Sequence, residues 1–197
     1  MPKIVTEQDK ETLRNTLRQK AIDLIKEKGV ANITVSDIAN AAGIAKGTFY
    51  TCYNSKDEFF YSIISRAEKK VFEYAESAEF RACSYRERVI NLFSFAYFTP
   101  DSIARYIAPD DLNLLARKNP EAYRIKDRKN DSMLAEIFDI PQDDMILKSL
   151  NFLMDSLQFA VSYKQKIDEE LRRSFLNSVV DILADYLEEK RDNPNDE

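Results

Sequence analysis

The chain has 197 residues, of which 44% are hydrophobic and 32% are charged, and its net charge is −5. This composition supports a folded core in one large domain or two small ones. No run of 18 apolar residues without a charge occurs, so we expect no membrane partner. The chain also has no histidine, the commonest general base and metal ligand, so we expect no enzyme, no metal and no cofactor.

Charge and cysteine are distributed unevenly along the chain. Residues 1–53 hold eight Lys/Arg and six Asp/Glu, a net of +2, whereas residues 54–197 hold 21 and 28, a net of −7. This difference predicts a basic head on an acidic body. Cys52 and Cys83 are isolated, and the N-terminal residues MPKIVTEQDK lack an apolar signal region. These features predict a cytoplasmic location without disulfides.

The sequence pattern predicts helices throughout, because strand-like alternation is rare and glycine-rich hairpin turns are missing. In the head, Thr6 caps a first helix, which Gly29 ends. Thr34 caps a short second helix, which Gly43 ends. A third short helix follows at about 45–52. Three helices around a tight turn are typical of a helix-turn-helix unit.

The rest of the chain is also expected to be helical. Ser55 caps a long helix, and Pro100 and Pro141 separate later segments. The helices expected beyond it cover about 85–99, 101–108, 110–118, 120–138, 143–164 and 168–190.

The turn between the second and third helices carries the chemistry expected of a DNA contact. Gly47 lets another molecule approach the backbone, and Lys46 adds positive charge beside the free N–H groups of the third helix. Thr48 can reach a base edge, and Tyr50 can donate to a phosphate. An ordinary turn of a helical bundle is the alternative interpretation, with Phe49 in the core, and periodicity alone does not decide between the two.

Residues 13–61 resemble the DNA-binding domain of the TetR/AcrR family of transcriptional regulators. The matching stretches are EKG at 27–29, ITVSDIANAAGIAKGTFY at 33–50 and NSKDEFF at 54–60. Members of this family place the third helix in the major groove of the operator. The resemblance therefore implies DNA contacts from Thr34, Ser36, Lys46, Gly47, Thr48, Tyr50 and Lys56.

The sequence departs from the family pattern in two respects. Ala45 stands where a serine commonly caps the third helix, and the loss of such a cap costs about 1 kcal/mol. Cys52 and Tyr53 stand where His or Tyr and then Phe are common. The departure at Cys52 removes one expected phosphate contact.

The last two helices predict either a deep monomeric bundle or a dimer. Residues 145–161 are apolar nearly all round, and the last helix has two adjacent apolar stripes. The resemblance implies a homodimer through these helices, with an interface that includes Phe152, Leu153, Phe175, Val179, Ile182, Leu183 and Tyr186.

The middle helices are rich in aromatic residues, which serve either as plain core or as the wall of a ligand pocket. In the family, these helices enclose an inducer. The resemblance implies a small-molecule ligand, for which we expect contacts from Phe93, Tyr97, Tyr123, Asn151, Asp155 and Phe159.

These features predict an all-α fold, with a helix-turn-helix DNA-binding domain over 1–54 and a helical ligand-binding and dimerisation domain over 55–197. The expected function is a dimeric, sequence-specific DNA-binding regulator, a repressor that a small-molecule ligand releases from a palindromic operator. The alternative is a helical protein-interaction module whose DNA-binding head no longer reads sequence.

Overall fold

The computed structural model describes residues 6–99, 102–140, 145–162 and 168–192, so Pro100, Pro141 and the residues after 192 lie outside it. All regular elements in these ranges are helical, which confirms the all-α prediction. The elements are α1 (Glu7–Lys28), η1 (Val30–Asn32), α2 (Val35–Ala41), α3 (Lys46–Phe49), α4 (Lys56–Ala75), α5 (Ala78–Ala82), α6 (Tyr85–Phe93), η2 (Ser94–Phe98), η3 (Ile103–Tyr106), α7 (Pro109–Lys118), α8 (Pro120–Ile137), α9 (Met145–Ser162) and α10 (Glu169–Asp192). None of the described helices is both long and apolar enough to cross a membrane.

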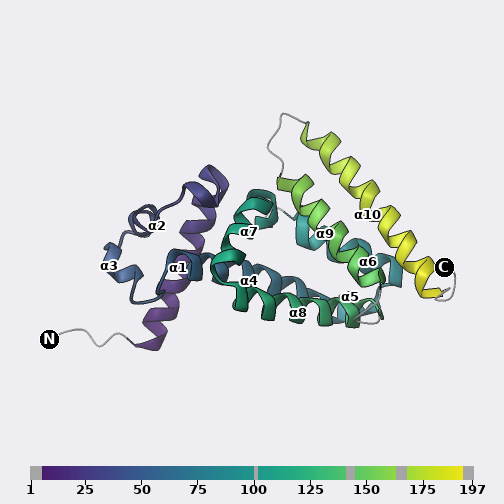
Figure 1. Cartoon of the computed structure of the whole chain (residues 1–197), viewed down its shortest axis with the longest axis horizontal. Coiled ribbons are helices and arrows are strands. Elements are labelled where there is room, and N and C mark those ends of the chain that lie inside the picture. The colour runs from purple at the N-terminus through teal and green to yellow at the C-terminus, as the bar shows by residue number, and fades with distance from the viewer. Residues whose placement is uncertain (1–5, 100–101, 141–144, 163–167, 193–197) are drawn as a thin grey trace.

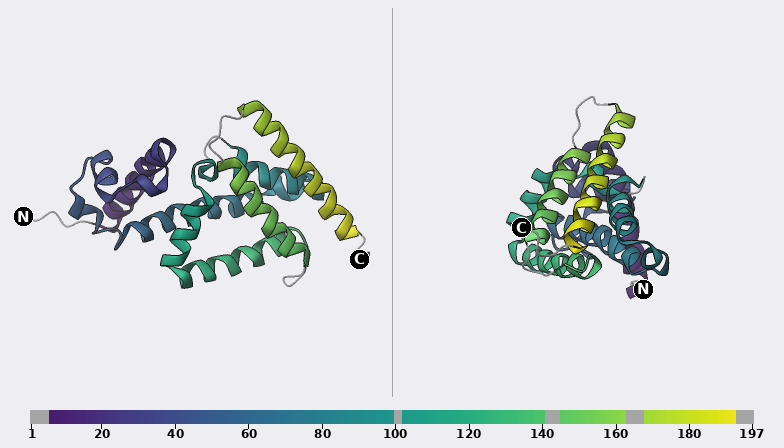
Figure 2. Two further views of the ribbon diagram at one scale, coloured as in Figure 1. Left: turned by 45° about the horizontal axis from the view of Figure 1, so that its top comes forward. Right: turned by 90° about the vertical axis from the view of Figure 1, so that its right-hand side faces the viewer.

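The molecule is elongated, with a small head and a larger body (Figure 1). Helices α1, α2 and α3 form the head, and α4 leads from the head into the body. Helix α8 runs alongside α4, while α9 and α10 lie at the end of the body away from α3 (Figures 1 and 2). The fold thus separates the helix-turn-helix from the last helical pair.

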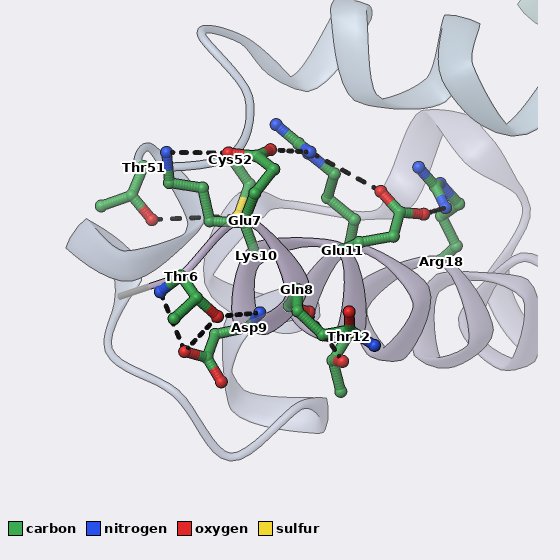
Figure 3. Close-up of polar contacts among 11 residues, drawn as sticks. Thr6, Glu7, Gln8, Asp9, Lys10, Glu11, Thr12, Arg18, Thr51 and Cys52 are labelled. Carbon is green, nitrogen blue, oxygen red and sulfur yellow. Dashed lines mark hydrogen bonds and ion pairs between the residues drawn. The ribbon is translucent and has the colours of Figure 1, made fainter. Parts of the chain in front are cut away.

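Capping fixes both ends of α1 as predicted. The Thr6 hydroxyl accepts from the Asp9 N–H at 3.1 Å, and the Thr6 N–H donates to the Asp9 carboxylate at 2.9 Å (Figure 3). At the other end Gly29 has φ +74°, and its N–H donates to the Ile25 carbonyl at 2.9 Å. Four ion pairs along the exposed face join Glu7 and Glu11 to basic side chains one or two turns further along α1.

The turn between α2 and α3 depends on Gly43, which has φ +68°. Its N–H donates to the Asn40 carbonyl, and the Ile44 N–H donates to the Ala39 carbonyl at 3.0 Å. Helix α3 is shorter than the expected 45–52, because the chain passes from Tyr50 into turns before α4 begins.

The head has a hydrophobic core that continues into the body. Phe49 is fully buried, as expected of a core residue, and its ring lies 5.3 Å from Phe59 and 5.7 Å from Tyr53. Residues of η3, α7 and α8 belong to the same cluster. Its members, called here the head cluster, are Leu17, Ala21, Ile25, Val30, Ile33, Val35, Ile38, Phe49, Tyr53, Phe59, Phe60, Ile63, Ile64, Ile103, Ile107, Leu115 and Tyr123.

The body differs from expectation in two places. The helix expected over 85–99 is α-helical only to Phe93 and then continues as the π-helical turn η2. At its end the Thr99 hydroxyl donates to the Phe95 carbonyl at 3.1 Å. The short helix α5 was not expected. Ser77 starts it by accepting from the Phe80 N–H, the same capping chemistry that starts the longer helices.

Two glycine substitutions should separate backbone strain from packing. A Cβ added at Gly43 or Gly47 meets no heavy atom within 4 Å, but only Gly43 has a positive φ. We expect Gly43→Ala to lower the free energy of unfolding by about 1–2 kcal/mol, since an L-residue is strained in that conformation. Gly47→Ala should stay within about 0.5 kcal/mol of the parent, because alanine favours a helix. Urea unfolding measures both, and equal losses would contradict this account.

Candidate nucleic-acid interface

Helix α2 begins at a reciprocal cap. The Thr34 hydroxyl accepts from the Asp37 N–H at 3.1 Å and donates to the Asp37 carboxylate at 2.7 Å, while the Thr34 N–H donates to the same carboxylate at 2.8 Å. These bonds lower the pKa of Asp37. The hydroxyl expected to contact phosphate is therefore also a structural cap. Ser36, half-buried in the first turn of α2, makes no side-chain hydrogen bond to another described residue.

Helix α3 packs one face on the head cluster and leaves the other open. Phe49 points inward, and Gly47 lies about 160° away around the helix, because successive residues are 100° apart. Lys46 is exposed, Tyr50 is 48% exposed and Thr48 is half-buried. The open face thus brings together four of the predicted DNA-contact residues.

Ala45 occupies the N-cap position of α3 and supplies no side-chain bond. The structure therefore lacks the N-cap bond that a serine at position 45 would make. Two interactions stabilise α3 in the absence of a side-chain cap. Phe49 packs against Phe59, and the Thr48 N–H donates to the Ala45 carbonyl at 2.9 Å.

Lys56 lies at the start of α4, as the sequence predicted, but its ammonium is not fully open to solvent. The Nζ atom lies 5.6 Å from the centre of the Phe60 ring, and burial lowers the Lys56 pKa. The nearby Lys118 ammonium bonds to the Asp57 carboxylate at 3.2 Å. Lys56 is thus held against the α4 surface on the rim of the head.

The sequence predictions missed one residue that positions α3. The Glu58 carboxylate accepts from the Asn54 backbone N–H at 2.8 Å and from the Asn54 amide at 2.9 Å, while the Glu58 N–H donates to the Ser55 hydroxyl. These bonds fix the turn between α3 and α4. An acidic residue three positions after a serine cap was a signal that could have identified it.

The six residues predicted to bind a ligand are divided between two hydrophobic clusters and helix α9. Phe93 and Tyr97 are buried in the body, and the Tyr97 hydroxyl donates to the Met154 carbonyl at 3.4 Å. Tyr123 belongs instead to the head cluster, with its ring 5.2 Å from that of Tyr61.

The remaining three of these residues lie on α9. The Asn151 amide donates to the Asp131 carboxylate of α8 at 2.9 Å. Asp155 is exposed, although partial burial raises its pKa, and Phe159 is 57% exposed. A ligand contact from these six residues stays a prediction.

The predicted dimer residues share a surface on α9 and α10. Phe152 is 71% exposed and Ile182 is 68% exposed, while Leu183 is buried beneath them. A groove of about 580 Å³ runs along this surface, and it is lined by Met145, Lys148, Ser149, Phe152, Leu153, Val179, Ile182, Leu183 and Tyr186. Phe175 lies outside the groove but is also strongly exposed.

Comparison with known proteins agrees with the geometry of the head. Residues 17–63 match the family model described as bacterial regulatory proteins, tetR family. The HTH-type transcriptional regulator BetI of Rhizobium meliloti (strain 1021) is 28% identical over 112 residues, or 55% of this chain and 54% of BetI. The uncharacterized HTH-type transcriptional regulator YvdT of Bacillus subtilis (strain 168) is 49% identical over 39 residues, 20% of each chain. The match thus spans about half the length of BetI and less of YvdT.

Two solved structures share the overall fold. The fatty acid degradation regulator FadR from Bacillus halodurans superposes with a TM-score of 0.57 at 20% identity, covering 88% of this chain and 93% of FadR. A TetR-like transcriptional regulator from Rhodococcus sp. RHA1 gives a TM-score of 0.52 at 18% identity, covering 85% and 93%. The helix-turn-helix segment of this chain is thus similar to that of the tetR family of bacterial regulators, and the all-helical fold of the chain is similar to that of these two regulators.

Proposed function

We propose that this chain is a dimeric, sequence-specific DNA-binding repressor that a small-molecule ligand releases from a palindromic operator. The observation that carries the proposal is the open face of α3. Phe49 anchors the helix in the head cluster, while Lys46, Gly47, Thr48 and Tyr50 are left for another molecule. This is the arrangement expected of a recognition helix in the major groove.

Each residue of the open face has a separate role in this proposal. The Lys46 ammonium neutralises a phosphate, and the Tyr50 hydroxyl donates to another. Thr48 reads a base edge with its hydroxyl or its methyl group. Gly47 lets the DNA backbone approach α3, since no atom of the protein occupies the space that a Cβ would take. Thr34, Ser36 and Lys56 complete the phosphate contacts around the head.

A homodimer would place two heads on one operator. The exposed apolar face of α9 and α10 is the surface proposed for the second copy, because burying it removes large side chains such as Phe152 and Ile182 from water. The two-fold axis of such a dimer matches a palindrome with half-sites about 34 Å apart.

For a ligand to release the protein from DNA, a change of structure in the body must alter the position of the head. The segment from Ile103 to Ile107 can transmit such a change, because both residues belong to the head cluster and η3 contacts α1. The Gln158 amide of α9 donates to the Ala104 carbonyl at 2.8 Å and to the Ile107 carbonyl at 2.7 Å. A shift of α9 would therefore pull on the segment that supports α1. The ligand favours the arrangement of the two heads that does not fit the operator. Operator affinity then falls according to the difference in the ligand's binding free energy between the fitting and the non-fitting arrangement.

We retain the proposed division into a DNA-binding domain over 1–54 and a ligand-binding and dimerisation domain over 55–197. The division describes function rather than packing. The head cluster includes Leu115 and Tyr123 of the body, so its apolar contacts cross the boundary.

Removing the charge of Lys46 should weaken binding to every DNA sequence. Because one fewer counterion is released, Lys46→Gln should reduce the slope of log K against log salt by about one. Lys70→Gln is the matched control, since it removes the same charge from an exposed site in the third quarter of α4. Fluorescence anisotropy on one duplex over a salt series measures the slope, and an unchanged slope for Lys46→Gln would place this lysine outside the interface.

Selection of bound duplexes from a random pool at physiological salt tests the proposed function directly. We expect an enriched palindrome for the parent chain. Thr48→Ala should enrich the same half-sites with relaxed preference at one base pair, because the side chain that contacts that base edge is lost. No enrichment by the parent chain would refute sequence-specific binding and favour the protein-interaction module.

A charge placed on the apolar face of α10 should break the dimer. Ile182→Glu introduces a carboxylate that must stay hydrated, so we expect a monomer that has also lost most of its operator affinity. Ile125→Glu is the matched control, because Ile125 is an equally apolar side chain, 58% exposed on α8. Sedimentation velocity measures the mass, and a stable Ile182→Glu dimer would rule out this interface.

A further inference from the structure

A second cavity lies on the body, at a place that none of the predicted ligand residues reaches. Its volume is about 420 Å³, within the range of small-molecule sites. Helices α4, α6 and α10 and the π-helical turn η2 surround it, and it is lined by Tyr74, Asn91, Ser94, Phe95, Phe98, Thr99, Arg173 and Asn177. We call it the α4–α10 cavity.

One wall of the α4–α10 cavity is flat and aromatic. The rings of Tyr74 and Phe95 stack at 4.5 Å between centroids and 13° between planes. The pair is half-buried, and Phe98 extends the apolar surface beside it. Both phenylalanines come from η2, and π-helical turns occur often at functional sites. Because the two rings cover each other's inner faces, a planar apolar group can pack against an outer face or the edges of this pair.

The opposite side of the cavity is polar and carries one charge. Arg173 is the sole charged residue of the lining, and neither it nor Asn177 bonds to another described residue. The polar groups of the aromatic side are partly engaged, since the Asn91 amide donates to the Cys83 sulfur and the Thr99 hydroxyl to the Phe95 carbonyl. The donors that α10 leaves for a ligand are thus a guanidinium and an amide, and the Tyr74 and Ser94 hydroxyls are further donors of the lining. A guanidinium binds a carboxylate through two parallel hydrogen bonds.

The cavity stays accessible in the proposed dimer. Arg173 precedes Phe175 by two residues, so the two side chains point about 160° apart around α10. A buried stripe of α10 contains Leu176 and Val180, and Phe175 lies on the exposed apolar face on one side of it. Arg173 and Asn177 lie toward the other side of that stripe. A second copy on the apolar face would leave both donors uncovered.

We propose that the α4–α10 cavity binds a small organic anion with a flat apolar body, an aromatic carboxylate in the simplest case. The ring lies against Tyr74 and Phe95, and the carboxylate pairs with Arg173 beside Asn177. Among the described residues of this lining a cation finds no acidic partner, and a ligand with several phosphates would need more than one positive side chain.

The position of the cavity connects such a ligand to DNA binding, a connection that rests on the function proposed above. Tyr74 lies at the end of α4, and the start of the same helix contributes Phe59 and Phe60 to the head cluster. A ligand that bridges Tyr74 and Arg173 fixes the end of α4 against α10. Because α10 carries the dimer face, the ligand would set the angle of each head relative to the two-fold axis.

Direct binding of 2-naphthoate and 4-phenylbutyrate to the full chain tests the proposal. The chain contains no tryptophan, so naphthoate emission can be followed without an indole background. We expect saturable binding of at least one of these carboxylates, and weaker binding of its neutral amide. Arg173→Gln should weaken carboxylate binding about tenfold, equivalent to about 1.4 kcal/mol, and leave binding of the amide nearly unchanged.

Two further variants separate the site from general charge and from folding. Arg117→Gln removes the same charge from an exposed position on α7, outside the lining, and should bind like the parent. Asn177→Phe fills the cavity from an exposed position and should weaken the acid and the amide alike. Absence of saturable binding by both carboxylates, or unchanged affinity in Arg173→Gln, would overturn the proposal.

The outcomes distinguish this site from the function proposed for the chain. If naphthoate binds with the expected Arg173 dependence and no DNA sequence is enriched, the site is right and the repressor proposal is wrong. If a palindrome is enriched and neither carboxylate binds, the regulator stands and this cavity is not its ligand site.

Discussion

The placement of helix α3 depends on one hydrophobic cluster that joins the head to the body. Helix α3 has only four residues and no side-chain cap, so it cannot hold its own shape. Phe49 supplies the anchor, packing against Tyr53 and Phe59 in a cluster that extends to Ile103 and Leu115. The contacts that stabilise the head therefore include residues of the body. In the proposed regulator, a change in the body that moves Ile103 or Leu115 would alter the packing that supports α3.

Local chemistry determined most of the head, and the sequence was sufficient to predict it. Thr6 and Thr34 cap their helices, and Gly43 adopts the positive φ that its turn requires, because each of these effects depends on neighbours within four residues. Phe49 was expected in the core and is fully buried there. The family resemblance was found in this same segment, where short-range patterns are strongest.

The body was harder to predict, because its site depends on contacts between distant segments. The aromatic residues near position 95 were expected to line a pocket, but Phe93 is buried in the core whereas Phe95 lines a cavity. Helical periodicity places these two side chains on opposite faces, but it does not say which face is core and which is cavity. Arg173 is about eighty residues away in sequence. Only the packing of α10 against α6 brings it to the same space.

The cluster shared by head and body limits how freely this head could be exchanged. In a protein whose domains touch only through a linker, a DNA-reading module can be grafted onto another scaffold with little cost. Here the graft would leave Ile103, Ile107, Leu115 and Tyr123 facing an unmatched surface. A working chimera would have to bring η3, α7 and the start of α8 along with the first four helices. The part of the chain that would have to be transferred together is thus discontinuous in sequence, and it extends well beyond the helix-turn-helix.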